Sequence, residues 1–259
     1  MIQTKKLIFF DIDGTLLDRH NRIPASAKQA VLALQENGHM VALASGRSPF
    51  MLEQIRLELG LESYVSFNGQ YVMHQGELIH SNPICSDALN QLSAFASLSG
   101  HPLVYLDRSQ MSCSQEYHPH VDLCLTSLGV AHPRYEKQFC ETRLIYQTML
   151  FCTEEEEASY REKFCDLKFV RWHPLSMDVL PAGGSKAEGI SILADRMGFT
   201  PEHVYAFGDN FNDIEMFRYA GCSIAMGNAP HSLQQIASHV TANAEQDGIL
   251  HGLKWAGLL

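Results

Sequence analysis

The sequence lacks a hydrophobic run long enough to cross a membrane, and none of its seven cysteines forms a C-x-x-C pair. An odd number of thiols leaves one over in any complete pairing, and the spacing of structural zinc ligands is absent. We therefore expect reduced cysteines, mostly buried as small hydrophobic residues, in preference to a redox or zinc role. The residues before Asp11 include too few apolar side chains for a secretory signal, which predicts a soluble, intracellular protein.

Positive charge is also scarce: 19 lysines and arginines against 29 acidic residues give a formal net charge of -10. This charge repels polyanions, so the sequence predicts neither a nucleic-acid partner nor an anionic membrane partner. A small anion can still bind where a metal ion and local dipoles reverse the sign. With 259 residues, of which 46% are hydrophobic, the chain can bury a full core as one large domain or as a domain with an insertion.

Two carboxylates follow an uninterrupted apolar run near the start of the chain. The run from Leu7 to Phe10 predicts a strand that is buried on both faces. Asp11 follows this strand directly, and Asp13 precedes the expected turn at Gly14. Ligands bind at the C-terminal ends of such strands, and two like charges in one small volume need a cation, a shared proton or open solvent. The alternative is an ordinary turn after a strand, because Asp and Gly are common turn residues.

Strands and helices alternate in two parts of the chain, which predicts an α/β fold with a parallel sheet. A helical apolar stripe covers 26–37, a short strand covers 40–44, and another helix begins at Pro49. The pattern returns late in the chain as a helix over 190–197, a strand over 204–207, a helix from about 212 and a strand over 223–225.

The intervening stretch has longer mixed segments, and we interpret residues 83–183 as an inserted domain, with 1–82 and 184–259 forming the core. Thr153 followed by the four glutamates 154–157 predicts a helix start with Glu156 at the capping-box position. A solvated helix start is favoured over a metal site for these glutamates.

If the apolar strands are neighbours, Asp11, Asp13 and Asp209 meet at one edge of the sheet. Asp11 could then attack phosphorus and form an aspartyl-phosphate, while Asp13 protonates the leaving oxygen and later takes a proton from water. Mg²⁺ prefers oxygen ligands, which Asp11, Asp209 and the backbone carbonyl of Asp13 could supply.

Donors for the phosphoryl oxygens come from other strand ends and helix starts. Ser45, the backbone N–H of Gly46 and Lys186 are the candidates, and Asn212 could add a further donor while Asp213 orients metal-bound water. Taken singly, Asn and Asp at a helix start are usually caps, Ser45 a turn residue and Lys186 a solvated lysine. The co-occurrence of all four segments, in order, favours a phosphoryl-transfer site.

These four segments together resemble the motifs of the haloacid dehalogenase (HAD) superfamily, and most closely its Cof-type (subclass IIB) phosphatases. The segments are Asp11-Ile12-Asp13-Gly14-Thr15-Leu16, Ala44-Ser45-Gly46-Arg47, Gly184-Ser185-Lys186 and Gly208-Asp209-Asn210-Phe211-Asn212-Asp213, with Ser66-Phe67-Asn68-Gly69 as a further similarity. The resemblance implies a Rossmann-like core, an α/β cap inserted between the second and third motifs, Mg²⁺-dependent hydrolysis of phosphate monoesters and a cytoplasmic location.

The resemblance also implies roles for individual residues. Asp11 would be nucleophile and metal ligand, Asp13 acid/base and carbonyl metal ligand, and Asp209 a metal ligand. Ser45 and Lys186 would bind phosphate. The resemblance more weakly implies that Asn210 contributes to the metal site and Asn212 to phosphate binding. Ala187 departs from the family pattern, which more often has glycine there, and this puts in doubt how closely that helix start approaches its neighbours.

Arg47, Asn68, Trp172 and His173 could contact substrate. Each of these residues is more often structural, Trp172 as a core residue and His173, beside Pro174, as a loop residue. His118-Pro119-His120 could hold a metal, but a solvated loop is favoured because the expected hard metal prefers oxygen.

The sequence thus predicts a phosphatase for small phosphorylated metabolites, such as sugar phosphates, nucleotides or phosphorylated cofactors, acting as a monomer or small homo-oligomer. Two alternatives stay open: a phosphomutase that uses the same intermediate, and a regulator that binds a phosphorylated metabolite without turnover.

Overall fold

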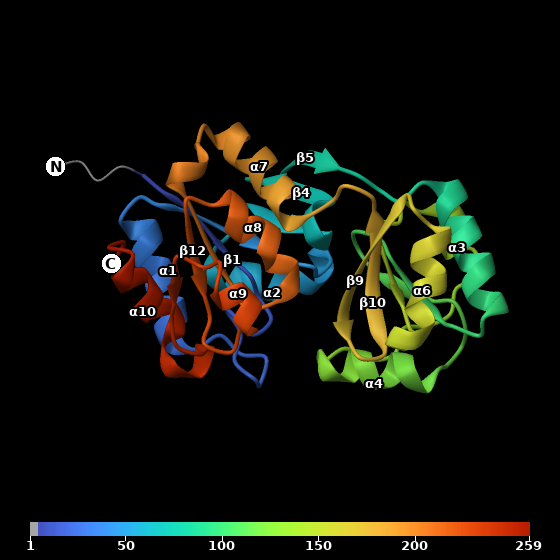
Figure 1. Ribbon diagram of the computed structural model, residues 1–259. Helices are drawn as coiled ribbons and strands as arrows, with labels where there is room; N and C mark the ends of the chain where they lie inside the picture. Colours follow the sequence, from blue (N-terminus) through green and yellow to red (C-terminus); the bar gives the residue numbers. More distant parts are fainter. Residues whose placement is uncertain (1–4) are drawn as a thin grey trace. The chain divides into compact units, whose positions relative to one another are not determined.

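The computed structural model describes residues 5–259, which form two compact units (Figure 1). The first unit contains the chain up to residue 47, residues 51–81 and residues 185–259; the second contains 48–50 and 82–184. The boundaries expected from the sequence, after 82 and after 183, each differ by one residue from this division. That the second unit acts as a cap stays a prediction.

An eight-stranded sheet forms the centre of the first unit, in the order β13-β12-β11-β1-β2-β3-β4-β5. All pairs from β13 to β3 are parallel, and β4 and β5 join as antiparallel strands. This confirms the predicted α/β class with a parallel core. The strands are β1 (Leu7–Phe10), β2 (Met40–Ala44), β3 (Tyr64–Ser66), β4 (Tyr71–His74), β5 (Glu77–Ser81), β11 (Val204–Gly208), β12 (Cys222–Ala225) and β13 (His239–Val240).

Helices cover both faces of this sheet because its central strands are apolar on both sides. One face packs against α7, α8 and α9 through a core that includes Phe9, Ile190 and Phe217. On the other face, α10 packs against α1, which contacts β2 (Figure 1). Helix α2 lies beside α1, since Lys28 of α1 forms an ion pair with Glu58 of α2 at 3.1 Å. The helices are α1 (Ala25–Glu36), α2 (Pro49–Leu59), α7 (Lys186–Met197), α8 (Ile214–Tyr219), α9 (His231–Gln234) and α10 (Gly248–Trp255), with short 3₁₀ turns η1 (Phe67–Gly69), η2 (Pro201–His203), η3 (Phe211–Asp213) and η4 (Ala244–Gln246).

The second unit is built on a five-stranded antiparallel sheet in the order β7-β6-β8-β10-β9. Helices α3 and α6 pack on one face through a core that includes Leu92, Tyr160 and Met177. The elements are β6 (Leu103–Leu106), β7 (Met111–Cys113), β8 (Gln147–Leu150), β9 (Leu167–His173), β10 (Ser176–Pro181), α3 (Ser86–Leu98), α4 (Pro119–Ser127), α5 (Phe139–Thr142) and α6 (Glu154–Lys163).

Helix α6 begins with the predicted capping box. The backbone N–H of Thr153 donates to Glu156 Oε2 at 2.8 Å, which satisfies a group that the helix itself leaves unpaired. The expectation of four solvated glutamates is wrong for Glu157, whose side chain is largely buried and forms ion pairs with Arg161 and with Arg171 Nε. Burial raises the pKa of Glu157, but the two arginines together lower this pKa by a larger amount, so the net shift is downward.

All seven cysteines are free thiols. The expectation that most are buried is wrong: three are buried, two are partly exposed, and Cys85 and Cys165 are exposed, because they lie at helix boundaries on the surface of the second unit. Among the described residues, no helix has both the length and the apolar composition needed to cross a membrane.

Helix α7 approaches η1 very closely because two glycines face each other there. A Cβ atom on Gly69, whose φ is +102°, would lie 1.9 Å from the carbonyl oxygen of Ser185. A Cβ atom on Gly189 would lie 2.9 Å from Gly69 Cα. Gly69 and Gly189 therefore allow the start of α7 to lie close to η1. Ala187, which departs from the family pattern, does not prevent this close approach.

We predict that Gly69→Ala lowers the apparent melting temperature by about 6 °C or more, because it adds a backbone clash to an unfavourable left-handed conformation. Gly76→Ala is the matched control, since its φ is +80° but nothing lies within 4 Å of the added Cβ. Its expected loss is about 3 °C, from backbone strain alone. Equal losses in calorimetry would contradict the packing argument.

Candidate active site

A buried ion pair joins the end of β1 to the start of α7. Asp11 follows β1 directly and continues its pairing, since its N–H donates to the Phe207 carbonyl at 2.9 Å. Lys186, the first residue of α7, is almost completely buried, and its Nζ lies 2.5 Å from Asp11 Oδ1 and 2.6 Å from Asp213 Oδ1. One ammonium group therefore holds two carboxylates from segments far apart in the sequence.

The charges around Asp11 are not balanced by this one lysine. Burial raises the pKa of Asp11 well above its ordinary value; Lys186 lowers it, and Asp213, Asp209 and Asp13 raise it. Burial alone would lower the pKa of Lys186, but Asp11 and Asp213 raise it overall, so the lysine stays protonated. A surplus of negative charge remains, and a cation would neutralise it.

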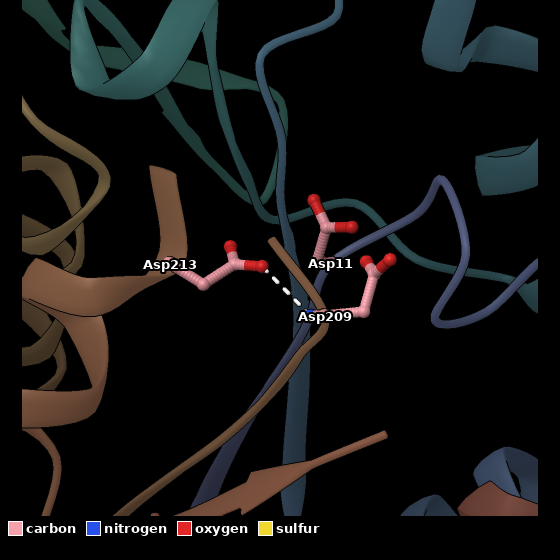
Figure 2. A group of neighbouring side chains, drawn as sticks. All are labelled: Asp11, Asp209 and Asp213. Carbon is pink, nitrogen blue, oxygen red and sulfur yellow. Dashed lines mark hydrogen bonds between the residues drawn. The ribbon is translucent and has the colours of Figure 1, made fainter. Parts of the chain in front are cut away.

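Asp209 completes a group of three carboxylates (Figure 2). Asp11, Asp209 and Asp213 each offer an oxygen, and these oxygens lie within 4.8 Å of one another. Asp209 follows β11 and accepts from Thr15 Oγ1 at 3.0 Å and from Asn228 Nδ2 at 2.9 Å. Burial, and then the charge of Asp213, raise the pKa of Asp209 to about 7.

This donor set fits a hard divalent cation, because it consists of carboxylate oxygens in a site with surplus negative charge. Asp213 is the least suited of the three as a ligand. Its Oδ1 accepts from Lys186, and its Oδ2 accepts from the backbone N–H groups of Asp209 and Asn210, each at 2.9 Å, the first of them drawn as a dashed line in Figure 2. Asp11 and Asp209 are therefore the better candidates to hold a metal.

Asp13 has a cation of its own. Arg47 Nε donates to Asp13 Oδ2 at 2.8 Å, and Arg47 Nη2 donates to Oδ1 at 2.6 Å. This is a two-point guanidinium–carboxylate pair, which fixes orientation as well as charge. Asp11 and Asp13 thus lie one residue apart but are held by different cations.

The loop after β2 is clamped by the segment after β3. The backbone N–H of Phe67 donates to the Arg47 carbonyl and that of Asn68 to the Ser45 carbonyl, each at 3.0 Å. Both Phe67 and Asn68 have a φ of +50°, a conformation that costs non-glycine residues free energy. Ser45 is buried, and its Oγ accepts from the Arg47 N–H at 3.1 Å. The strained segment therefore fixes the predicted phosphate-binding loop.

Asn68 also links this loop to the turn after β11. Asn212 Nδ2 donates to Asn68 Oδ1 at 3.1 Å, and a Cβ atom on Gly46 would lie 2.9 Å from Asn68 Nδ2. Asn210 caps η3, since its Oδ1 accepts from the Phe211 N–H at 2.8 Å. Asn210 thus acts as a helix cap, the common role of Asn at a helix start. Asn212 instead lies beside the loop that carries Ser45.

Trp172 and His173 lie on β9 in the second unit. His173 Nδ1 lies 3.2 Å from Cys124 Sγ and accepts from the Leu175 N–H at 3.1 Å, which gives this residue a local structural role. His118 caps α4 by accepting from the His120 N–H at 3.2 Å. Within residues 5–259, the acidic group above is the one set of three or more His, Cys, Asp or Glu side chains with ligand atoms close enough to share an ion.

Sequence reasoning missed Thr15 and Asn228 as partners of Asp209, and missed that Arg47 binds Asp13. Asn228 follows β12, a parallel neighbour of β11, so the rule that collects residues at strand ends could have included it. Arg47 follows β2 by three residues, as Asn228 follows β12, and Thr15 lies in the segment that contains Asp11. These positions do not indicate which carboxylate each side chain binds.

A family model described as haloacid dehalogenase-like hydrolase matches residues 8–253. The chain belongs to this family. Within it, the chain is similar to a protein named "Putative phosphatase YkrA" from Bacillus subtilis strain 168, with 44% identity over 254 residues and 98% of each chain covered.

Solved structures of HAD hydrolases place the chain among the Cof-type, subclass IIB members. A hypothetical protein from Geobacillus kaustophilus HTA426 is 45% identical, with a TM-score of 0.92 and coverage of 98% of this chain and 100% of the other. A HAD subclass IIB sugar phosphatase is 29% identical, with a TM-score of 0.88 and coverage of 98% and 100%. HAD phosphatases use a divalent metal, which agrees with the carboxylate group at the end of β1.

We predict that Asp209→Asn stabilises the metal-free HAD protein, and more so as pH rises. The folded-state pKa of Asp209, about 7, is above its ordinary value of 3.8, so its contribution to stability is complete below about pH 4 and is lost as pH rises through 7. In a chelator, the melting temperature of the variant minus that of the original protein should grow between pH 5 and pH 8, reaching about 2 °C or more.

The control for this measurement is Asp195→Asn, which removes an exposed carboxylate of α7. Its difference from the original protein should stay flat over the same pH range. A flat difference for Asp209→Asn as well would show that the metal-free site tolerates its negative charge.

Proposed function

We propose that this HAD hydrolase is a Mg²⁺-dependent phosphatase of small phosphorylated metabolites that works through an aspartyl-phosphate. The observation that carries the proposal is the buried Asp11 carboxylate, held by Lys186 beside Asp209 at the C-terminal ends of parallel strands. A carboxylate in this position can act as a nucleophile toward phosphorus.

In the first half-reaction, Asp11 attacks phosphorus while the bond to the leaving oxygen breaks. Lys186 orients the carboxylate and places positive charge beside the incoming phosphoryl group. Asp13 donates the proton that the leaving oxygen requires. In the second half-reaction, water attacks the phosphorylated Asp11, and Asp13 takes the proton from that water.

Asp11, Asp209 and the backbone carbonyl of Asp13 would hold Mg²⁺, which neutralises the charge of carboxylates and phosphate when bound. Ser45 Oγ and the Gly46 N–H would donate to the phosphoryl oxygens. Their loop is held by Asn68, so these donors need little rearrangement when a phosphoryl group arrives.

The substrate class is supported by the relatives. One is a sugar phosphatase, and another, 26% identical over 264 residues, is named "5-amino-6-(5-phospho-D-ribitylamino)uracil phosphatase YitU" from Bacillus subtilis strain 168. Both names describe phosphate monoesters of small polyhydroxylated molecules. A panel of phosphorylated metabolites, scored by released phosphate, selects among sugar phosphates, nucleotides and phosphorylated cofactors. The cytoplasmic location stays a prediction.

Asp11→Asn should lower the turnover of an aryl phosphate by about a thousandfold or more, because the amide is not a nucleophile toward phosphorus. The fold should be retained, as judged by calorimetry. Asp195→Asn serves as the control and should turn over normally.

Full activity of Asp11→Asn would refute the covalent mechanism. Two other outcomes identify the alternatives: formation of a sugar-phosphate isomer without phosphate release favours a phosphomutase, and tight ligand binding without hydrolysis across the panel favours a regulator.

Chelation should abolish turnover, and added Mg²⁺ should restore it. Asp209→Asn should raise the Mg²⁺ concentration for half-maximal activity by about tenfold or more, because it removes a charged oxygen ligand. An unchanged Mg²⁺ requirement in this variant would exclude Asp209 from the metal site.

A further inference from the structure

We propose that Arg47 is a positioning residue that orients Asp13 for the hydrolysis of the phosphorylated Asp11. The inference rests on the proposed function, and it assigns Arg47 to the proton-transfer machinery in place of the substrate contact expected from the sequence.

The geometry of the pair is the first argument. Arg47 presents Nε and Nη2, the two donors on one side of its planar guanidinium, to the two oxygens of Asp13 at 2.8 and 2.6 Å. A lysine ammonium is a point charge and cannot hold both oxygens in this plane. The contact therefore fixes the rotation of the Asp13 carboxylate as well as its charge.

Asp13 needs such a partner because of its position. It lies in the turn after β1, and 41% of its side chain is exposed, whereas the side chain of Arg47 is only 13% exposed. Across residues 5–259, Arg47 provides the only side-chain hydrogen bonds to Asp13. Without them, an exposed aspartate samples several rotamers, most of which point away from any one reacting atom.

Arg47 is itself held at its backbone. Its N–H donates to Ser45 Oγ at 3.1 Å, and its carbonyl accepts from the Phe67 N–H at 3.0 Å. The guanidinium is thus anchored in the loop that carries Ser45. This arrangement couples the position of Asp13 to the loop that would bind the phosphoryl group.

The contact suits the second half-reaction. Water oxygen bonds to phosphorus as the bond between phosphorus and the Asp11 oxygen breaks, and one water proton passes to an Asp13 oxygen. Both Asp13 oxygens accept hydrogen bonds from Arg47, so the carboxylate is held in one orientation while the water proton is transferred. The proton accepted from water is then given to the leaving oxygen of the next substrate, so the cycle balances.

The test compares Arg47→Gln and Arg47→Lys with the original protein, using p-nitrophenyl phosphate and Mg²⁺ in a rapid-mixing instrument. Nitrophenolate is a good leaving group that needs little help from an acid, so the first half-reaction should continue in Arg47→Gln while the second slows. We expect a burst of up to one nitrophenolate per enzyme, then steady turnover reduced about tenfold or more, with KM changed less than about twofold.

Arg47→Lys keeps the charge but not the two-point contact, and should recover only part of the lost turnover. Arg196→Gln is the matched control, because Arg196 forms an exposed ion pair with Glu77. It should behave like the original protein. Combining Arg47→Gln with Asp13→Asn should cost nothing beyond Asp13→Asn alone, since Arg47 acts through Asp13.

Several outcomes would overturn the role of Arg47: unchanged turnover in Arg47→Gln, a raised KM with kcat retained, or a further loss in the Asp13→Asn background. If Arg47→Gln fails to fold, the Arg47→Lys variant and its Asp13→Asn combination decide by the same criteria. An original protein that releases no nitrophenolate would overturn the proposed function, and the inference with it.

Discussion

The contact between the Lys186 ammonium and the carboxylates of Asp11 and Asp213 determines how the first unit's site is assembled. Removing an ammonium group from water is costly, and the cost is offset here by two short ionic hydrogen bonds. These bonds tie α7 to the end of β1 and to the turn that precedes α8. The close approach of α7 to Gly69 places the lysine where both carboxylates can reach it.

The same contact leaves the site with surplus negative charge. One buried lysine faces three carboxylates, and the raised pKa values of Asp11 and Asp209 express the cost of ionising them together. Without a cation, the repulsion between these carboxylates lowers the stability of the folded protein. Groups with shifted pKa values of this kind are concentrated at functional sites. Family membership and charge balance thus lead to the same expectation of a divalent metal.

Much of the first unit's fold was predictable because its signals are local. The runs 7–10 and 40–44 are apolar on both faces, which is typical of central parallel strands, and both are strands in the structure. In the second unit, Leu103–Leu106 is a similar apolar run and forms the buried strand β6, but other strands lack this pattern. Strand β9 mixes buried, partly exposed and charged residues, including Arg171, so its strand character depends on pairing with β10 rather than on its own pattern.

The sequence by itself determined which chemical groups stand at the strand ends and helix starts: Asp11, Asp13, Ser45, Lys186 and Asp209. The tertiary structure alone decided which of them bind each other. Lys186 donates a hydrogen bond to Asp213, and Arg47 donates to Asp13. Thr15 and Asn228 donate to Asp209. Hydrogen bonds require a donor and an acceptor about 3 Å apart in the right direction, and that geometry arises only when distant segments pack together.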